Sequence, residues 1–179
     1  GFFMALYDVS EANAYRRGDV SLVYPLTRSL PVLLVPCICF LIRYGKPLSF
    51  LTVLGMIVIA IGCFVLPLKP AGVSPTKYFS RAALLCIVLA SIGTTGYTII
   101  DSMGLALLKG NSAHYTPVTA ALLYVSFEYL FGMMFLIPYV ACSRREKHQL
   151  RMIWKYSRRF PLMTGIIITS SYILVLLAM

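Results

Sequence analysis

The sequence predicts an all-α, polytopic membrane protein, and three observations lead to that class. Of the 179 residues, 59% are hydrophobic and only 12% are charged, which is more apolar sequence than a soluble core needs. The apolar residues are gathered into repeated segments of roughly 20 residues, each long enough as a helix to cross a hydrocarbon core about 30 Å thick. Most of the basic residues stand between these segments, where membrane orientation uses them.

The net charge of +10 fits this class better than it fits a nucleic-acid partner. Seven of the 16 Lys and Arg residues fall between positions 144 and 159, and no basic surface alternates with stacking aromatics in a soluble domain. We therefore expect membrane lipid, and no nucleic acid, around the chain. The cysteines lie in or beside apolar segments without zinc-type spacing, so we expect neither a metal nor a cofactor; they are Cys37, Cys39, Cys63, Cys86 and Cys142.

Six membrane helices are predicted, separated by polar or turn-forming residues. They run from the start to about Tyr15, then over 20–42, 49–66, 82–108 and 117–142, and finally from Phe160 to the end. Polar turns such as residues 16–19 and 44–47 divide them. The first helix is cut short and the last stops within an apolar run, so we expect an internal fragment of a longer protein.

A longer connection divides the six helices into two groups. Residues 68–79 contain Pro70, Gly72 and Pro75, which interrupt regular structure. The predicted organisation is therefore one region over 1–68, a linker over 69–79 and a second region over 80–179.

Glycines on two of the predicted helices indicate close helix packing. Gly55 and Gly62 are seven residues apart and share a face, and Gly93 and Gly96 lie close together on the next helix. Missing side chains let another helix approach. An alternative interpretation of the second pair is that the polar residues beside it, such as Tyr97, line a cavity.

The distribution of basic residues predicts the orientation. The connections at 16–19, 67–81 and 143–159 hold twelve of the Lys and Arg residues, whereas the other two connections hold three. The positive-inside rule then places the first three connections in the cytoplasm.

Arg28 is the main candidate for a functional residue, because it is the one charge within the apolar segment 20–42. A charge in the bilayer core costs from about 3 to more than 10 kcal/mol, so it normally faces a protein interior or a wet cavity. Three prolines in the same segment remove amide donors, and broken helices at membrane depth often hold transporter substrate sites. The predicted substrate pathway comprises Ser21, Tyr24, Pro25, Arg28, Pro31, Tyr97 and Glu128.

Helix depth indicates which acids could meet Arg28. Arg28 lies roughly 13 Å and Asp8 roughly 12 Å from the same membrane side, so we predict an ion pair that is either structural or part of the pathway. Glu128 lies about 16 Å into its helix, near the midplane, where carboxylates commonly relay protons or cations; it is the second candidate partner. Asp101 lies about 30 Å from that side, and we expect it near the interface, solvated and away from Arg28.

The segment AYRRGDVSLVYPLTRSLP, residues 14–31, resembles the EamA-like permeases of the drug/metabolite transporter superfamily. In that family a similar stretch joins the third and fourth helices. The resemblance implies a ten-helix bundle of two inverted five-helix repeats that moves small metabolites by alternating access. Region 1–68 would be the C-terminal part of the first repeat, and region 80–179 the N-terminal part of the second.

Two features depart from that family. Many members have an acid in the turn where this chain has Gly45, Lys46, Pro47 and Leu48, so no role of that acid carries over. Members with both ends in the cytoplasm would also place the connections at 16–19 and 143–159 outside, opposite to the charge count.

The resemblance implies an integral membrane transporter or exporter of a small metabolite, not an enzyme, in a bacterial cytoplasmic membrane. Proton coupling through Glu128 and an assembly of several copies are both compatible with it. The alternatives are a membrane scaffold subunit without transport and a membrane-embedded enzyme. The enzyme has little to build on, because His114 and His148 lie in connections and no metalloprotease, nucleophile-elbow or phosphate-loop motif is present.

Overall fold

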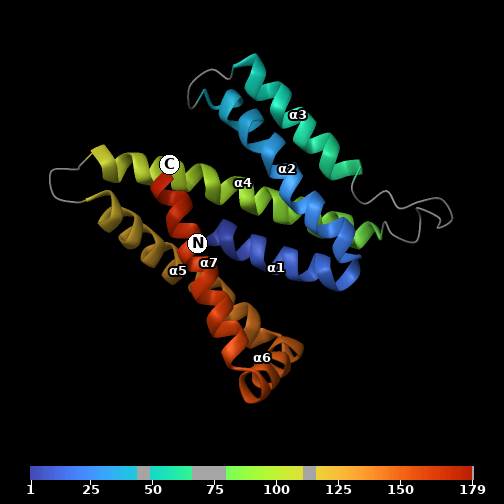
Figure 1. The fold of residues 1–179 in the computed structure, drawn as a ribbon. Coiled ribbons are helices and arrows are strands. Elements are labelled where there is room, and N and C mark those ends of the chain that lie inside the picture. The colour runs from blue at the N-terminus through green and yellow to red at the C-terminus, as the bar shows by residue number, and fades with distance from the viewer. Residues whose placement is uncertain (44–48, 66–79, 111–115, 179) are drawn as a thin grey trace. The chain divides into compact units, whose positions relative to one another are not determined.

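The computed structural model describes residues 1–43, 49–65, 80–110 and 116–178, and in these ranges it contains helices and no strand (Figure 1). The described residues form seven helices. They are α1 (Phe2–Arg17), α2 (Val20–Leu41), α3 (Phe50–Val65), α4 (Arg81–Gly110), α5 (Pro117–Cys142), α6 (Arg144–Tyr156) and α7 (Arg159–Ala178).

Four of these helices, α2, α4, α5 and α7, are long and apolar enough to span a membrane. Helices α1 and α3 have 16 residues each, or about 24 Å at 1.5 Å per residue, which is less than a hydrocarbon core about 30 Å thick. The structure therefore supports a polytopic helical membrane protein with four candidate spans among the described residues. Because α1 starts at the beginning of the sequence and α3 ends where the described residues end, the count of six remains a prediction.

Helix α6 occupies a segment that the sequence analysis treated as a connection. Its first turn is capped by Ser143, whose Oγ accepts the amide hydrogen of Glu146 at 3.4 Å. The amide of Ser143 in turn donates to Tyr139 O at 3.2 Å and so ends α5. One serine therefore closes one helix and opens the next, because its side chain satisfies a donor that a helix start leaves unpaired.

The chain folds as two units, which we describe separately. The N-terminal unit is Phe3–Ile99, and the C-terminal unit is Ile100–Met179 with Gly1–Phe2. The boundary falls within α4. The predicted linker 69–79 lies outside the described residues, as does the turn of Gly45 to Leu48, and the division into repeats remains a prediction.

In the N-terminal unit, α1, α2 and the first part of α4 share a small apolar core. Ala14, Val23 and Ile87 are at most 1% exposed and belong to a single hydrophobic cluster. Gly93 brings α4 against α1, since a Cβ on it would lie 2.8 Å from Tyr7 N. The close approach predicted for this glycine is present.

Helix α3 packs along α2 (Figure 1), but its glycines do not make that contact. A Cβ on Gly55 or Gly62 would have no described atom within 4 Å. Among the described residues, therefore, no helix packs closely against the face that these two glycines share.

Helix α2 is one continuous helix despite Pro25, Pro31 and Pro36. Asp19 caps it by accepting the amide hydrogen of Ser21 at 2.9 Å. Thr27 Oγ1 donates to Val23 O at 3.0 Å, so this buried hydroxyl is paired within its own helix. The expected division of this segment into broken helices is not seen.

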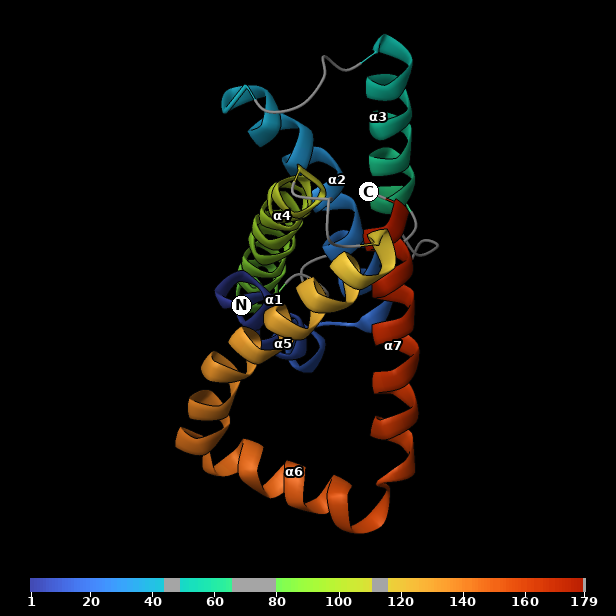
Figure 2. The same ribbon diagram turned by 90° about the vertical axis from the view of Figure 1, so that its left-hand side faces the viewer.

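In the C-terminal unit, α5 contacts both α6 and α7. Leu105, Ala121, Val125 and Leu176 form its apolar core, from α4, α5 and α7. Figure 2 shows α6 at the bottom of the view, where it joins the lower ends of α5 and α7. The three helices thus follow one another with short turns at Ser143 and at residues 157–158.

Candidate functional site

Two buried carboxyl groups meet inside the C-terminal unit. Asp101 on α4 is 2% exposed and Glu128 on α5 is 7% exposed. Tyr172 Oη on α7 lies within hydrogen-bond distance of both Asp101 Oδ2 and, at 2.7 Å, Glu128 Oε2. Tyr124 Oη donates to the other oxygen of Asp101, Oδ1, at 2.8 Å. We call these four residues the carboxyl cluster.

Helix periodicity explains how the carboxyl cluster is assembled. Tyr124 and Glu128 are four residues apart on α5, so both side chains lie on one face. Gly104 lies one turn from Asp101 on α4, and a Cβ on it would be 3.2 Å from Tyr124 Cζ. Gly104 therefore leaves room for the ring of Tyr124, and the hydroxyl of Tyr124 reaches Asp101.

Aromatic and hydroxyl neighbours hold the α7 side of the cluster. The rings of Tyr129 and Tyr172 are 6.5 Å apart between centroids, and Thr169 Oγ1 donates to Tyr129 Oη at 3.4 Å. These contacts join α5 to α7 and orient Tyr172 toward the acids.

An open, mainly apolar hollow of about 370 Å³ lies beside the carboxyl cluster. Its volume falls at the lower end of the range for small-molecule pockets. Tyr124 is the residue that the hollow and the cluster share; the lining is completed by Gly104, Leu108, Ala120, Leu123 and Phe127.

Arg28 belongs to a second polar group, in the N-terminal unit. Its Nη2 lies 3.9 Å from Glu11 Oε1, and its side chain is 50% exposed. Its guanidinium carbon is 6.0 Å from the ring centroid of Tyr7 and 5.7 Å from that of Tyr24. Tyr97 on α4 completes the group, because its ring contacts Tyr7 edge to face at 5.9 Å.

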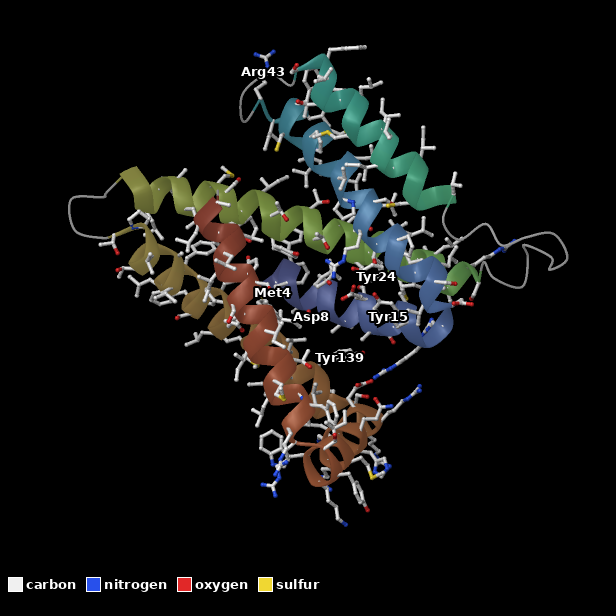
Figure 3. The ribbon with its side chains drawn as sticks, viewed as in Figure 1. Met4, Asp8, Tyr15, Tyr24, Arg43 and Tyr139 are labelled. Carbon is white, nitrogen blue, oxygen red and sulfur yellow. The ribbon has the colours of Figure 1, made fainter. Side chains whose placement is uncertain are left out.

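The acid that meets Arg28 is Glu11, not the predicted Asp8. Tyr7 and Glu11 are four residues apart and share one face of α1, and Tyr15, another turn on, donates to Glu11 Oε1 at 3.4 Å. Asp8 lies about 100° around the helix from Tyr7. Depth in the membrane, which was the basis for choosing Asp8, does not distinguish helix faces. Figure 3 labels Asp8 and Tyr15 on α1 and Tyr24 on α2.

The other predicted pathway residues have different places. Ser21 is exposed and its hydroxyl donates to Asp19 Oδ1 at 2.7 Å, within the cap of α2. Pro31 is buried and Pro25 is half-buried. Glu128 belongs to the C-terminal unit, where it meets Tyr172.

The sequence analysis also placed Asp101 wrongly. It was expected to be solvated near the interface, yet it is buried and accepts hydrogen bonds from two tyrosines. The signal that could have identified it was its position as the one acid in the apolar segment 82–108, together with tyrosines in both later helices.

Comparisons with protein-family models, with curated proteins and with solved structures find no match to this chain. The resemblance to EamA-like permeases therefore rests on residues 14–31 alone. Within the described ranges, no group of three or more His, Cys, Asp or Glu side chains is arranged to hold a metal ion.

Proposed function

We propose that this chain is part of a membrane transporter for a small metabolite, and that the carboxyl cluster is its proton-binding site. The observation that carries the proposal is the burial of Asp101 and Glu128 around one hydroxyl, between helices apolar enough to span a membrane. Ionisable groups at such positions are costly and commonly belong to ion or proton pathways.

Counting hydrogens supports proton binding at the cluster. A tyrosine hydroxyl has one hydrogen to donate, but Tyr172 Oη contacts two carboxyl groups. Both contacts are hydrogen bonds only when one carboxyl carries a proton and donates it to Tyr172 Oη. Another titratable group that acts on Asp101 is the Tyr124 hydroxyl. The cluster can thus hold or release a single proton with little movement of its heavy atoms.

The second part of the proposal concerns the pathway. We infer that Arg28, with the rings of Tyr7 and Tyr24, contacts the substrate, because a half-exposed guanidinium over aromatic faces can bind an anionic or aromatic group. The inverted-repeat bundle of ten helices implied by residues 14–31 is the architecture in which we place both groups.

Flux measurements on the full-length protein test the function. We expect vesicles containing it to take up at least one class of labelled organic acid, amino acid or nucleoside saturably, and an imposed pH gradient to drive that uptake. Glu128→Gln should abolish the dependence on the gradient. Glu146→Gln, which removes a carboxylate from α6 instead, should leave the dependence unchanged. Absence of saturable uptake of every class by folded protein would favour the scaffold alternative.

Infrared spectroscopy tests the proton site without a substrate. The carbonyl band of a protonated carboxylic acid should be present at neutral pH, persist in Glu146→Gln and disappear in the double variant Asp101→Asn with Glu128→Gln. If that variant does not fold, Tyr172→Phe keeps the ring while removing the shared hydroxyl, and it should shift the band. A spectrum of ionised carboxylates only would contradict the proposal.

A further inference from the structure

Helix α6 has a basic stripe along one side. Arg144, Lys147, Arg151 and Lys155 follow one another at intervals of three, four and four residues, so at about 100° per residue they fall on one face. Their side chains are exposed. The stripe runs the whole length of the helix.

Over residues 150–156, the side of α6 opposite the basic stripe is apolar and equally uncovered, whereas Glu146 and Gln149 lie on that side in the first half of the helix. Ile153 lies opposite the basic stripe, flanked by Leu150 and Tyr156, while Met152 and Trp154 lie at the two boundaries. Their exposed fractions are 48%, 58%, 71%, 47% and 57% in that order. None of the residues of α6 is buried. A helix with two such faces, and nothing from the described chain covering either, fits a boundary between an apolar and a charged medium.

The chain also fixes where α6 lies. It begins two residues after the last residue of α5 and ends three residues before the first residue of α7, and both neighbours are long and apolar enough to span a membrane. A helix of 13 residues tied at both ends in this way cannot move far from the surface at which the two spans emerge. Figure 2 shows it running between them.

We propose that α6 is an interfacial helix that binds the anionic headgroups of the bilayer. Its apolar face enters the boundary between headgroups and acyl chains, where Trp and Tyr side chains are favoured. Its basic stripe contacts the lipid phosphates, since Lys and Arg clusters on such helices are attracted to negatively charged leaflets. This binding surface is independent of the carboxyl cluster and of the proposed transport function.

The chain provides its own probe, because Trp154 is the single tryptophan of the sequence. The full-length protein is reconstituted into vesicles of phosphatidylcholine alone or with added phosphatidylglycerol. With the anionic lipid we expect Trp154 emission to shift to shorter wavelength, brominated lipids to quench it, and aqueous acrylamide to quench it less. The shift should shrink as salt is raised.

A charge-matched pair of variants assigns the effect to the stripe. Lys147→Gln with Arg151→Gln should remove the difference between the two kinds of vesicle. Arg17→Gln with Arg81→Gln removes two exposed positive charges elsewhere and should retain it.

Two results would overturn the proposal. One is emission that is identical in both vesicles and open to acrylamide in each. The other is a shift produced by an acidic polypeptide in solution but not by phosphatidylglycerol, which would make α6 a protein-binding surface. Because neither readout involves flux, failure here leaves the transport proposal standing, and failure of transport leaves this one standing.

Discussion

Single residues decide how closely the helices of the N-terminal unit approach. Gly93 lies against the backbone of α1, whereas Gly55 faces open space, although the two glycines look alike in the sequence. A methyl group added at the first must displace main-chain atoms, which cannot move as a flexible side chain does.

The same pair gives a prediction with a built-in control. Gly93→Ala should destabilise the protein by about 1 to 3 kcal/mol, because overpacking forces the α1 and α4 backbones apart. Gly55→Ala should be neutral or slightly stabilising, since alanine favours helix more than glycine does. Thermal unfolding of the two variants in detergent, followed by circular dichroism, compares them. Equal midpoints would mean that α1 does not contact Gly93.

At the scale of elements, the start of α2 depends on one side chain. Asp19 accepts hydrogens from the amide and the hydroxyl of Ser21, at 2.9 and 2.7 Å, and it stands where the chain turns from α1 into α2. The cap matters because helix α2 also contains three prolines and so has fewer backbone donors than its length implies.

Removing the cap should weaken α2 measurably. Asp19→Ala should cost about 1 kcal/mol, as is typical for loss of a helix N-cap. Asp19→Asn retains an acceptor oxygen and should cost much less. Amide hydrogen exchange over residues 20–24 is the local readout; equal exchange rates in both variants would show that the cap contributes nothing.

At the scale of the whole molecule, the described helices expose more apolar surface than a soluble protein exposes to water. On α7, Leu162 is 55%, Ile166 67% and Leu174 66% exposed, and Leu176 is the one residue of that helix among those described that is buried. Exposed apolar surface of this extent marks contact with lipid or with other proteins. The surface thus agrees with the membrane class that composition predicts.

Orientation in the membrane is the prediction that belongs to this scale. The charge count places the α5–α7 connection in the cytoplasm, so Cys142, exposed at the end of α5, should react with an impermeant maleimide only in inverted vesicles. In a background without other cysteines, Ser49→Cys should react only in right-side-out vesicles. The reverse pattern would support the orientation expected from the family resemblance.

Helix bounds were predictable from the sequence because their causes are local. The predicted 117–142 coincides with α5, and the predicted 20–42 ends one residue beyond α2. Within lipid a backbone must pair its own polar groups, so a long apolar run has little choice but to become a helix. The missed helix α6 is the exception, since its basic residues directed attention to topology and away from the spacing that makes it amphipathic.

The sequence by itself therefore determined the class of protein, the main helices and the presence of costly charges such as Arg28 and Glu128. Only the tertiary structure decided their partners: Glu11 rather than Asp8 for Arg28, and the shared Tyr172 hydroxyl for Asp101 and Glu128. The physical reason is that hydrophobicity and hydrogen bonding along one helix depend on neighbours in sequence. The direction in which each helix face points depends on packing against segments up to 71 residues away.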